Sequence, residues 1–312
     1  MELTPSKIYG AVSWHVRGLL ATEANRRVAF KARELWQPAE IEARRGAARD
    51  LASELLPELE IDRAAGYRML DRQWLPCIDE VCAIGKDVVS HAELSQGVAN
   101  GEKQFSRIRL AREQQRLTLI RIGLDRRLLA MAAAYLGVLP VISEADFFCS
   151  FATSGPFTKS QLWHCDDDAG DVLKIFIYCD DVAPANGPFE LIEPEASRRA
   201  RAAVGYRFAG RRYRVADAAM ERHVPPSQVI SLCGPAGTAF VVNTVHCFHR
   251  GSRITEPGKR RVAGVVCYCP PSGQTLPRRL AGGRAPLIDF APYFDDPIAR
   301  AALGQPLATR WL

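Results

Sequence analysis

The chain has 312 residues, of which 47% are hydrophobic and 24% are charged. This composition is typical of a soluble globular protein with a sizeable core. The longest apolar stretch, residues 128–142, is short for a membrane span and contains Pro140, so we expect no membrane segment. No long apolar run precedes a cleavage site near the start, so we expect no secretory signal.

The nine cysteines are an odd number, and no two of them form a Cys-x2-Cys pair. A disulfide framework normally needs an even number of cysteines, and a structural zinc site normally shows paired spacing. We therefore interpret the cysteines as buried reduced thiols in a cytoplasmic protein.

The net charge is +6, and the arginines cluster in one segment, residues 198–214. Such a segment is usually a solvated surface. It also has a second interpretation, a basic rim that attracts an anionic substrate. No zinc-finger, RNP or helix-turn-helix motif accompanies it, so we expect no nucleic-acid partner.

The first third of the chain predicts helices. Thr22 is a candidate N-cap for a helix whose apolar residues share one face: Val28, Ala32 and Leu35. A second helix is predicted over residues 39–56, ended by Pro57. A third begins after Asp125 as N-cap and ends at Gly137, where a C-terminal cap is expected.

Near residue 145 the helical pattern gives way to short apolar runs separated by Gly, Pro and Asn. These predict strands at residues 147–151, 172–179, 187–192, 229–232, 238–242 and 261–269. The run from Val172 to Tyr178 is nearly all apolar, as in a strand buried on both faces. Many short strands with turn signals indicate a sandwich or jelly roll.

We therefore predict one α+β domain over residues 1–312. Residues 1–145 form a mostly helical N-terminal part and residues 146–270 a jelly-roll catalytic core. Residues 271–312, rich in proline, are expected to wrap over the surface, with one short helix at residues 298–303.

His164 and Asp166 are two positions apart, and His246 and His249 follow much later in the chain. On a strand, alternate side chains point to the same face, so His164 and Asp166 can bind one ion. Taken alone, the pair has a simpler interpretation, a histidine hydrogen-bonded to a nearby carboxylate. With a distant histidine, it matches the two-histidine, one-carboxylate triad of non-haem Fe(II) oxygenases.

The surrounding segments add to this pattern. Leu162-Trp163-His164-Cys165-Asp166, the strand Leu173–Tyr178, Asp181-Val182 and Asn186-Gly187-Pro188-Phe189 follow in order, and Cys247–Arg253 comes later. Over about residues 147 to 269, the chain resembles the phytanoyl-CoA dioxygenase family. The resemblance implies an Fe(II)/2-oxoglutarate-dependent dioxygenase with a double-stranded β-helix core and O2 as oxidant.

The resemblance also implies site residues. Iron would be held by His164, Asp166 and His249, and Arg260, eleven residues beyond His249, would pair with the far carboxylate of 2-oxoglutarate. Halogenating relatives have a small residue in place of the carboxylate, so Asp166 favours oxygen chemistry.

Two choices stay open at this stage: His246 competes with His249 as ligand, and Arg261 competes with Arg260 as anchor. We also assign Lys174 and Ser252 to the cofactor site. Lys174 lies in an apolar strand, where a buried lysine needs a partner that the co-substrate carboxylate or an acidic residue could supply; the alternative is a lysine that extends to the sheet edge. Ser252 is close in sequence to His249.

The predicted reaction is hydroxylation of an unactivated C–H bond of a small molecule, with release of succinate and CO2. The arginine-rich segment suggests an acidic group on the substrate. Two alternatives differ in class: a non-catalytic jelly-roll binding protein, and a cupin-like metalloenzyme that does not use 2-oxoglutarate. The sequence predicts no particular oligomeric state.

Overall fold

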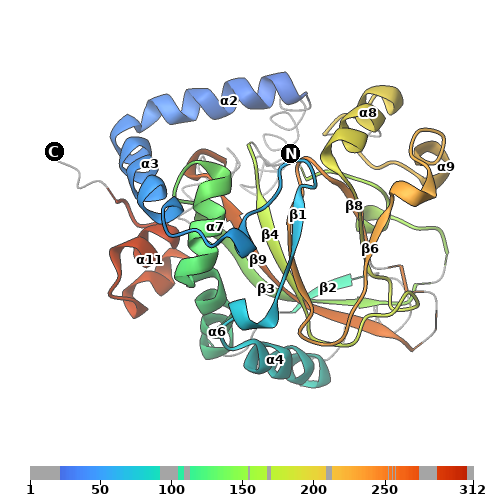
Figure 1. Ribbon diagram of the computed structural model, residues 1–312. Coiled ribbons are helices and arrows are strands. Elements are labelled where there is room, and N and C mark those ends of the chain that lie inside the picture. The colour runs from blue at the N-terminus through green and yellow to red at the C-terminus, as the bar shows by residue number, and fades with distance from the viewer. Residues whose placement is uncertain are drawn as a thin grey trace, which may run out of the picture.

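The computed structural model describes residues 22–91, 105–108, 113–153, 155–166, 170–208, 213–251, 253–254, 256, 258–273 and 287–307. It is a mixed structure in which the N-terminal helices cover one side of the larger antiparallel sheet, whereas the helices at residues 194–204 and 217–220 lie beside the smaller sheet (Figure 1). The helices are α2 (Glu23–Trp36), α3 (Pro38–Ala52), α4 (Ile78–His91), α6 (Glu113–Leu124), α7 (Arg126–Leu136), α8 (Pro194–Val204), α9 (Asp217–Met220) and α11 (Pro297–Ala302). The strands are β1 (Tyr67–Leu70), β2 (Phe105–Ile108), β3 (Val141–Phe151), β4 (Leu173–Tyr178), β5 (Phe189–Ile192), β6 (Ile230–Leu232), β7 (Ala239–Asn243), β8 (Phe248–Arg250) and β9 (Arg260–Cys269).

The strands form two sheets. The larger has six strands in the order β1-β7-β4-β9-β3-β2, and the smaller has three in the order β6-β5-β8. Every strand pair is antiparallel. Five of the six predicted strands are confirmed with shifts of one or two residues at their ends, and β3 begins six residues before its predicted start. Strands β1, β2 and β8 were not predicted.

Strand β4 shows how the larger sheet is buried on both faces. Leu173, Ile175 and Ile177 belong to the large core formed with the helices. The alternate residues Phe176 and Tyr178 belong instead to a cluster on the opposite face. Because successive side chains of a strand point to opposite faces, one nearly continuous apolar run serves both cores, as its sequence indicated.

The second face of the larger sheet packs against the smaller sheet. The Phe176 ring from β4 lies 4.8 Å from that of Phe189 in β5, and the Phe240 ring from β7 lies 5.4 Å from Phe189. Leu191 and Leu232 of the smaller sheet join the same cluster. The two sheets therefore face each other across an aromatic contact. Helices α3, α4, α6 and α7 lie outside the larger sheet, and α8 and α9 pack against the smaller one.

The helix caps agree with the sequence at three positions. The Thr22 hydroxyl accepts a hydrogen bond from the Asn25 amide, and Asp125 accepts one from the Arg127 amide. Gly137 ends α7 in the left-handed conformation at φ 69°, which glycine adopts without strain. The helix after Thr22 is confirmed, but its apolar face is not covered, since Val28 is 69% exposed and Leu35 is 80% exposed.

The C-terminal segment differs from the predicted surface wrap. The short helix is confirmed as α11, but Leu287, Ala291 and Leu303 are buried in the same core as the helices of the N-terminal part. The start and the end of the domain are thus packed together.

Arg44 joins these two ends of the chain. Its guanidinium is buried, pairs with Glu40 at 2.6 Å and donates to the backbone carbonyls of Leu139, Ala301 and Gln305. We expect Arg44→Ala to lower the free energy of unfolding by about 3 kcal/mol, because it removes a buried ion pair and three hydrogen bonds to backbone carbonyls. Urea unfolding followed by circular dichroism measures this change.

Arg45 is the matched control on the same helix. It pairs with Glu34 at 2.6 Å, but its side chain is 39% exposed. Arg45→Ala should therefore cost less than about 1 kcal/mol. Equal costs for the two variants would contradict the structural role given to Arg44.

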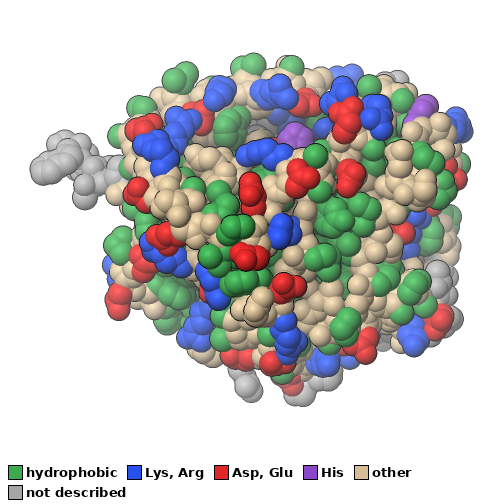
Figure 2. Space-filling model, in the orientation of Figure 1, with side chains coloured by type: hydrophobic (Ala, Val, Ile, Leu, Met, Phe, Trp, Pro, Cys, Tyr) green, Lys and Arg blue, Asp and Glu red, His purple; other side chains and the backbone are tan. Residues whose placement is uncertain are grey.

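Two further expectations can be compared with the described residues. All nine cysteines are free, as predicted, and seven of them are buried, whereas the predicted burial is wrong for Cys77 and Cys233. Within the described ranges, no helix is both long enough and apolar enough to cross a bilayer. On the face shown in Figure 2, basic side chains are interspersed with acidic ones, so that face carries no continuous basic patch.

Candidate metal centre

The backbone brings the two histidine segments side by side. His164 and His249 form an antiparallel bridge, with amide-to-carbonyl distances of 3.0 and 2.8 Å in the two directions. His249 lies on β8, so residue 164 continues the smaller sheet beyond that strand. As a result the two imidazole rings lie 4.2 Å apart between centroids.

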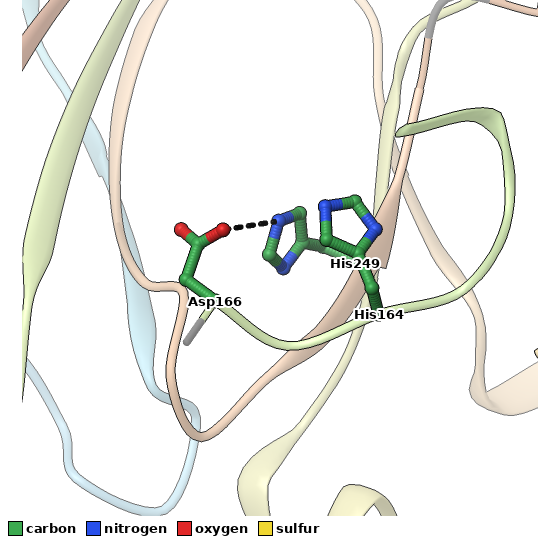
Figure 3. Close-up of side chains that lie close together, drawn as sticks. All are labelled: His164, Asp166 and His249. Atoms are coloured by element: carbon green, nitrogen blue, oxygen red, sulfur yellow. Dashed lines mark ion pairs between the residues drawn. The ribbon is translucent and has the colours of Figure 1, made fainter. Parts of the chain in front are cut away.

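Asp166 completes a cluster with these two rings. One ligand atom from each of His164, Asp166 and His249 lies within 4.8 Å of the others. The Nε2 atom of His249 is 3.9 Å from Oδ1 of Asp166. Figure 3 shows the three side chains turned toward one another, two from the segment before β4 and one from β8. Among the described residues, these three side chains are the group of histidine, cysteine or acidic residues whose ligand atoms lie close enough together to hold one metal ion.

The hydrogen bonds of the rings orient them for this role. Nδ1 of His164 lies 2.9 Å from the Leu162 carbonyl oxygen, and Nδ1 of His249 lies 3.1 Å from that of Cys247. A carbonyl only accepts, so each Nδ1 carries the proton, and each Nε2 keeps a lone pair for a metal. Burial lowers the pKa of both histidines below its ordinary value, which favours the neutral, ligating form.

Asp166 is held as a carboxylate by a cation on the facing sheet. Nζ of Lys174, on β4, lies 2.7 Å from Oδ2 of Asp166. Burial alone raises the pKa of Asp166, but the charge and hydrogen bond of Lys174 lower it below its usual range. Lys174 therefore has the acidic partner that its place in an apolar strand required, and that partner is a residue of the cluster itself.

The cluster opens into a cavity between the two sheets. Its volume is about 570 Å³, which suits a small molecule together with a cofactor. The walls come from β3, β4 and β9 of the larger sheet, from β5 and β8 of the smaller sheet, and from the segments that hold His164 and Arg214. The lining residues are Glu144, Phe148, Ser150, Lys159, Ser160, His164, Asp166, Lys174, Phe176, Tyr178, Phe189, Arg214, His249, Arg250, Gly251, Arg261, Ala263 and Val265.

The structure places Arg261, not Arg260, in this cavity. On β9, Arg261 lies on the same face as the lining residues Ala263 and Val265. Its guanidinium donates to the Gly187 carbonyl, lies 3.5 Å from the Ser150 hydroxyl and has its pKa lowered by burial. Arg260 points to the other face, where it lies 3.9 Å from Asp180 with 40% of its side chain exposed. Of the two candidates that the sequence left open, Arg261 is therefore the one that lines the cavity, because strand parity and not distance from His249 decides which side chain enters it.

The structure also separates His246 from His249, the two candidates for the distal metal ligand. His246 lies outside the cluster, with Nε2 2.7 Å from Oδ1 of Asp171. Asp171 also lies 3.7 Å from Arg63. His246 thus belongs to a separate ion-pair group. Ser252, the remaining predicted cofactor residue, lies outside the described residues.

Sequence reasoning did not identify two cavity arginines, Arg214 and Arg250. Arg250 is held by Glu190 at 2.6 Å and Asp217 at 2.5 Å, and it lies over the Trp163 ring. Arg214 belongs to the arginine-rich segment, which was interpreted as a possible basic rim. In that segment Arg198 and Arg199 instead pair with Glu195 on the exposed side of α8.

Comparison with known proteins gives partial structural similarities. No family model matches the chain, and no curated protein matches it significantly in sequence. A solved structure of the epimerase SnoN with Fe3+, α-ketoglutarate and nogalamycin RO has 15% identity and a TM-score of 0.45, over 72% of this chain and 84% of that one. The carbocyclase SnoK from nogalamycin biosynthesis has 16% identity and a TM-score of 0.45, over 70% and 85%. EctD from S. alaskensis, with 2-oxoglutarate and 5-hydroxyectoine, has 15% identity and a TM-score of 0.44, over 67% and 74%.

Proposed function

We propose that this protein is an Fe(II)/2-oxoglutarate-dependent oxygenase of the phytanoyl-CoA dioxygenase type, with its two sheets forming a double-stranded β-helix. The observation that carries the proposal is the convergence of two imidazole rings and one carboxylate at the edge of a cavity between the two sheets. Three protein ligands on one side of an ion leave its other positions free for small molecules. When bound, Fe(II) with 2-oxoglutarate supplies the oxidation of a C–H bond by O2, with succinate and CO2 as products.

We assign a role in metal binding to each residue of the cluster and to Lys174. His164, Asp166 and His249 would hold the ion, and the backbone bridge between the histidines keeps their rings at a set separation. Lys174 keeps Asp166 ionised and fixes its orientation. A group that orients a metal ligand in this way supports both the affinity and the geometry of the site.

Arg261 is the proposed anchor for the far carboxylate of 2-oxoglutarate. A guanidinium can bind a carboxylate through two parallel hydrogen bonds, which lysine cannot do. The Gly187 carbonyl and the Ser150 hydroxyl orient this guanidinium, as part of the cavity wall. The Tyr178 ring lies below it at 5.9 Å.

Apolar rings surround the cluster and limit water. The Phe189 ring stacks on His249, with centroids 5.3 Å apart and planes 11° from parallel, and Phe176 packs against Phe189. A reactive centre benefits from such a wall, because fewer water molecules reach it and electrostatic interactions inside are stronger. Hydroxylation of a small-molecule substrate is the proposed outcome of the reaction.

The proposed cellular location and partner rest on the composition of the chain. Nine free thiols are ordinary in a reducing compartment, so we propose a cytoplasmic location. The proposed partner is a small molecule rather than a nucleic acid or a membrane.

An anaerobic titration tests the proposal. Apo-protein receives Fe(II) and then 2-oxoglutarate while visible absorbance is recorded. We expect a weak visible charge-transfer band, which forms only when 2-oxoglutarate chelates iron held by the protein. Asp166→Asn should abolish the band, because the carboxylate is one of three ligand groups.

Folding of each variant is checked by its thermal unfolding midpoint. The absence of a band in folded wild-type protein free of other metals would refute the oxygenase proposal and leave a binding protein. A band with no succinate formed after O2 is admitted, even with a broad substrate panel, would favour a metalloenzyme of another type.

A further inference from the structure

The cavity carries more positive than negative side chains. Its basic residues are Lys159, Lys174, Arg214, Arg250 and Arg261, and its acidic residues are Glu144 and Asp166. Lys174 is paired with Asp166, and Arg250 is paired with Glu190 and Asp217. Arg261 is the proposed anchor for 2-oxoglutarate. Lys159 and Arg214 therefore have no role in the site as described so far, and of the two Arg214 lies beside the His164 segment.

The guanidinium of Arg214 is held in place but not satisfied. It lies over the Tyr213 ring, 4.1 Å from the ring centroid. Its Nη1 atom is buried and donates to no acceptor among the described residues. A buried N–H group without an acceptor is costly, and a guanidinium carries five such donors in a fixed plane. The arrangement is thus suited to receive an acceptor from outside the chain.

The backbone places Arg214 near the cluster of His164, Asp166 and His249 and on a different wall from Arg261. Val215 exchanges hydrogen bonds of 3.0 and 2.9 Å with Trp163, the residue before His164. The Arg214 segment is therefore the neighbour of the His164 segment at the edge of the smaller sheet. Arg261 lies on β9, in the larger sheet. The two arginines reach the cavity from different walls.

We propose that Arg214 binds a carboxylate of the substrate, so that the oxidised substrate is a small organic acid with an apolar body. This inference rests on the proposed function, since it names the substrate class of the same site. The apolar body would lie against the aromatic and aliphatic lining, which includes Phe148, Phe176 and Val265. The carboxylate would form the paired hydrogen bonds that a planar guanidinium favours. In this arrangement Arg214 would bind the substrate beside His164, while Arg261 binds the far carboxylate of 2-oxoglutarate.

Matched pairs of acids and amides provide the test. Protein saturated with Fe(II) and 2-oxoglutarate, without O2, is titrated with propionate, phenylacetate and decanoate and with the three corresponding amides. Shifts of the visible band report binding near the metal. We expect at least one acid to bind about 10-fold or more tightly than its amide, because only the acid pairs with Arg214.

Variants of Arg214 show whether this side chain, and not another feature of the cavity, causes the preference for acids. Arg214→Gln should remove the preference for that acid without changing binding of its amide or of 2-oxoglutarate, and Arg214→Lys should restore part of it. No preference for any acid in the wild type would overturn the inference. So would a preference that survives Arg214→Gln.

The outcome stays separate from the test of the proposed function. If Fe(II) and 2-oxoglutarate give no band, calorimetry of metal-free protein with the same pairs replaces the optical measurement. Acid preference lost in Arg214→Gln and kept in Arg261→Gln would then support the inference even though the oxygenase proposal had failed. Loss in Arg261→Gln alone would assign acid binding to the other arginine and overturn it.

Discussion

His249→Ala is expected to abolish iron-dependent conversion of 2-oxoglutarate to succinate, with a fall of more than about 100-fold, because even groups that only orient metal ligands cost about 10–100-fold when replaced. His249 contributes an Nε2 atom 3.9 Å from Asp166 and a ring 4.2 Å from His164. Its removal leaves two ligand groups of three. Succinate release, and iron retained per protein after desalting, measure the effect.

His246→Ala is the matched control, three residues earlier in the chain. His246 pairs with Asp171 at 2.7 Å and lies outside the cluster. Its replacement should change succinate release and iron retention by less than about twofold, since a half-exposed pair of this kind contributes about 1 kcal/mol or less. If His246→Ala lost iron while folded His249→Ala kept it, the assignment of the distal ligand would be wrong.

The strands of the core could be predicted because each carries its own signal. Strand β4 is an apolar run bounded by turns, and β9 is another, so both appear in the sequence at nearly their observed ends. Strands β1 and β2 have four residues each and are defined by pairing with β7 and β3, far along the chain. Such pairing is a tertiary effect, and local pattern cannot show it.

Burial was harder to predict than secondary structure. The apolar positions of α2 follow helical spacing, yet Val28 and Leu35 are exposed. Periodicity indicates which side chains share a face, but not which element covers that face. The reverse error occurred at the C-terminal end, where prolines suggested a surface segment and Leu287 and Leu303 instead lie in the core.

In the candidate site too, local sequence signals could be predicted and tertiary contacts could not. His164 and Asp166 are close in sequence, and strand geometry alone places them together. Their meeting with His249 depends on a backbone bridge, which the family resemblance implied and spacing alone did not. Arg214 was not singled out, because it joins the cavity only through the bridge between Trp163 and Val215.

Arg261→Gln is expected to weaken 2-oxoglutarate binding by roughly 100-fold, about 2.7 kcal/mol, because truncating one partner of a buried charged pair costs about 2–5 kcal/mol. The register of β9 supports the choice of this residue. Arg261 is opposite Ser150 on β3, and two positions further Ala263 is opposite Phe148, all on the cavity face. The anaerobic titration with 2-oxoglutarate gives the dissociation constant, and iron binding measured separately should not change.

Arg260→Gln is the control one position away, on the opposite face of the same strand. Arg260 is 40% exposed and 3.9 Å from Asp180, so its loss should alter the dissociation constant by less than about twofold. The pair of variants keeps charge loss, residue type and strand constant and changes only the face. A larger effect from Arg260→Gln than from Arg261→Gln would restore the anchor that spacing predicted. Equal and small effects would mean that 2-oxoglutarate is held elsewhere in the cavity, or is not the co-substrate.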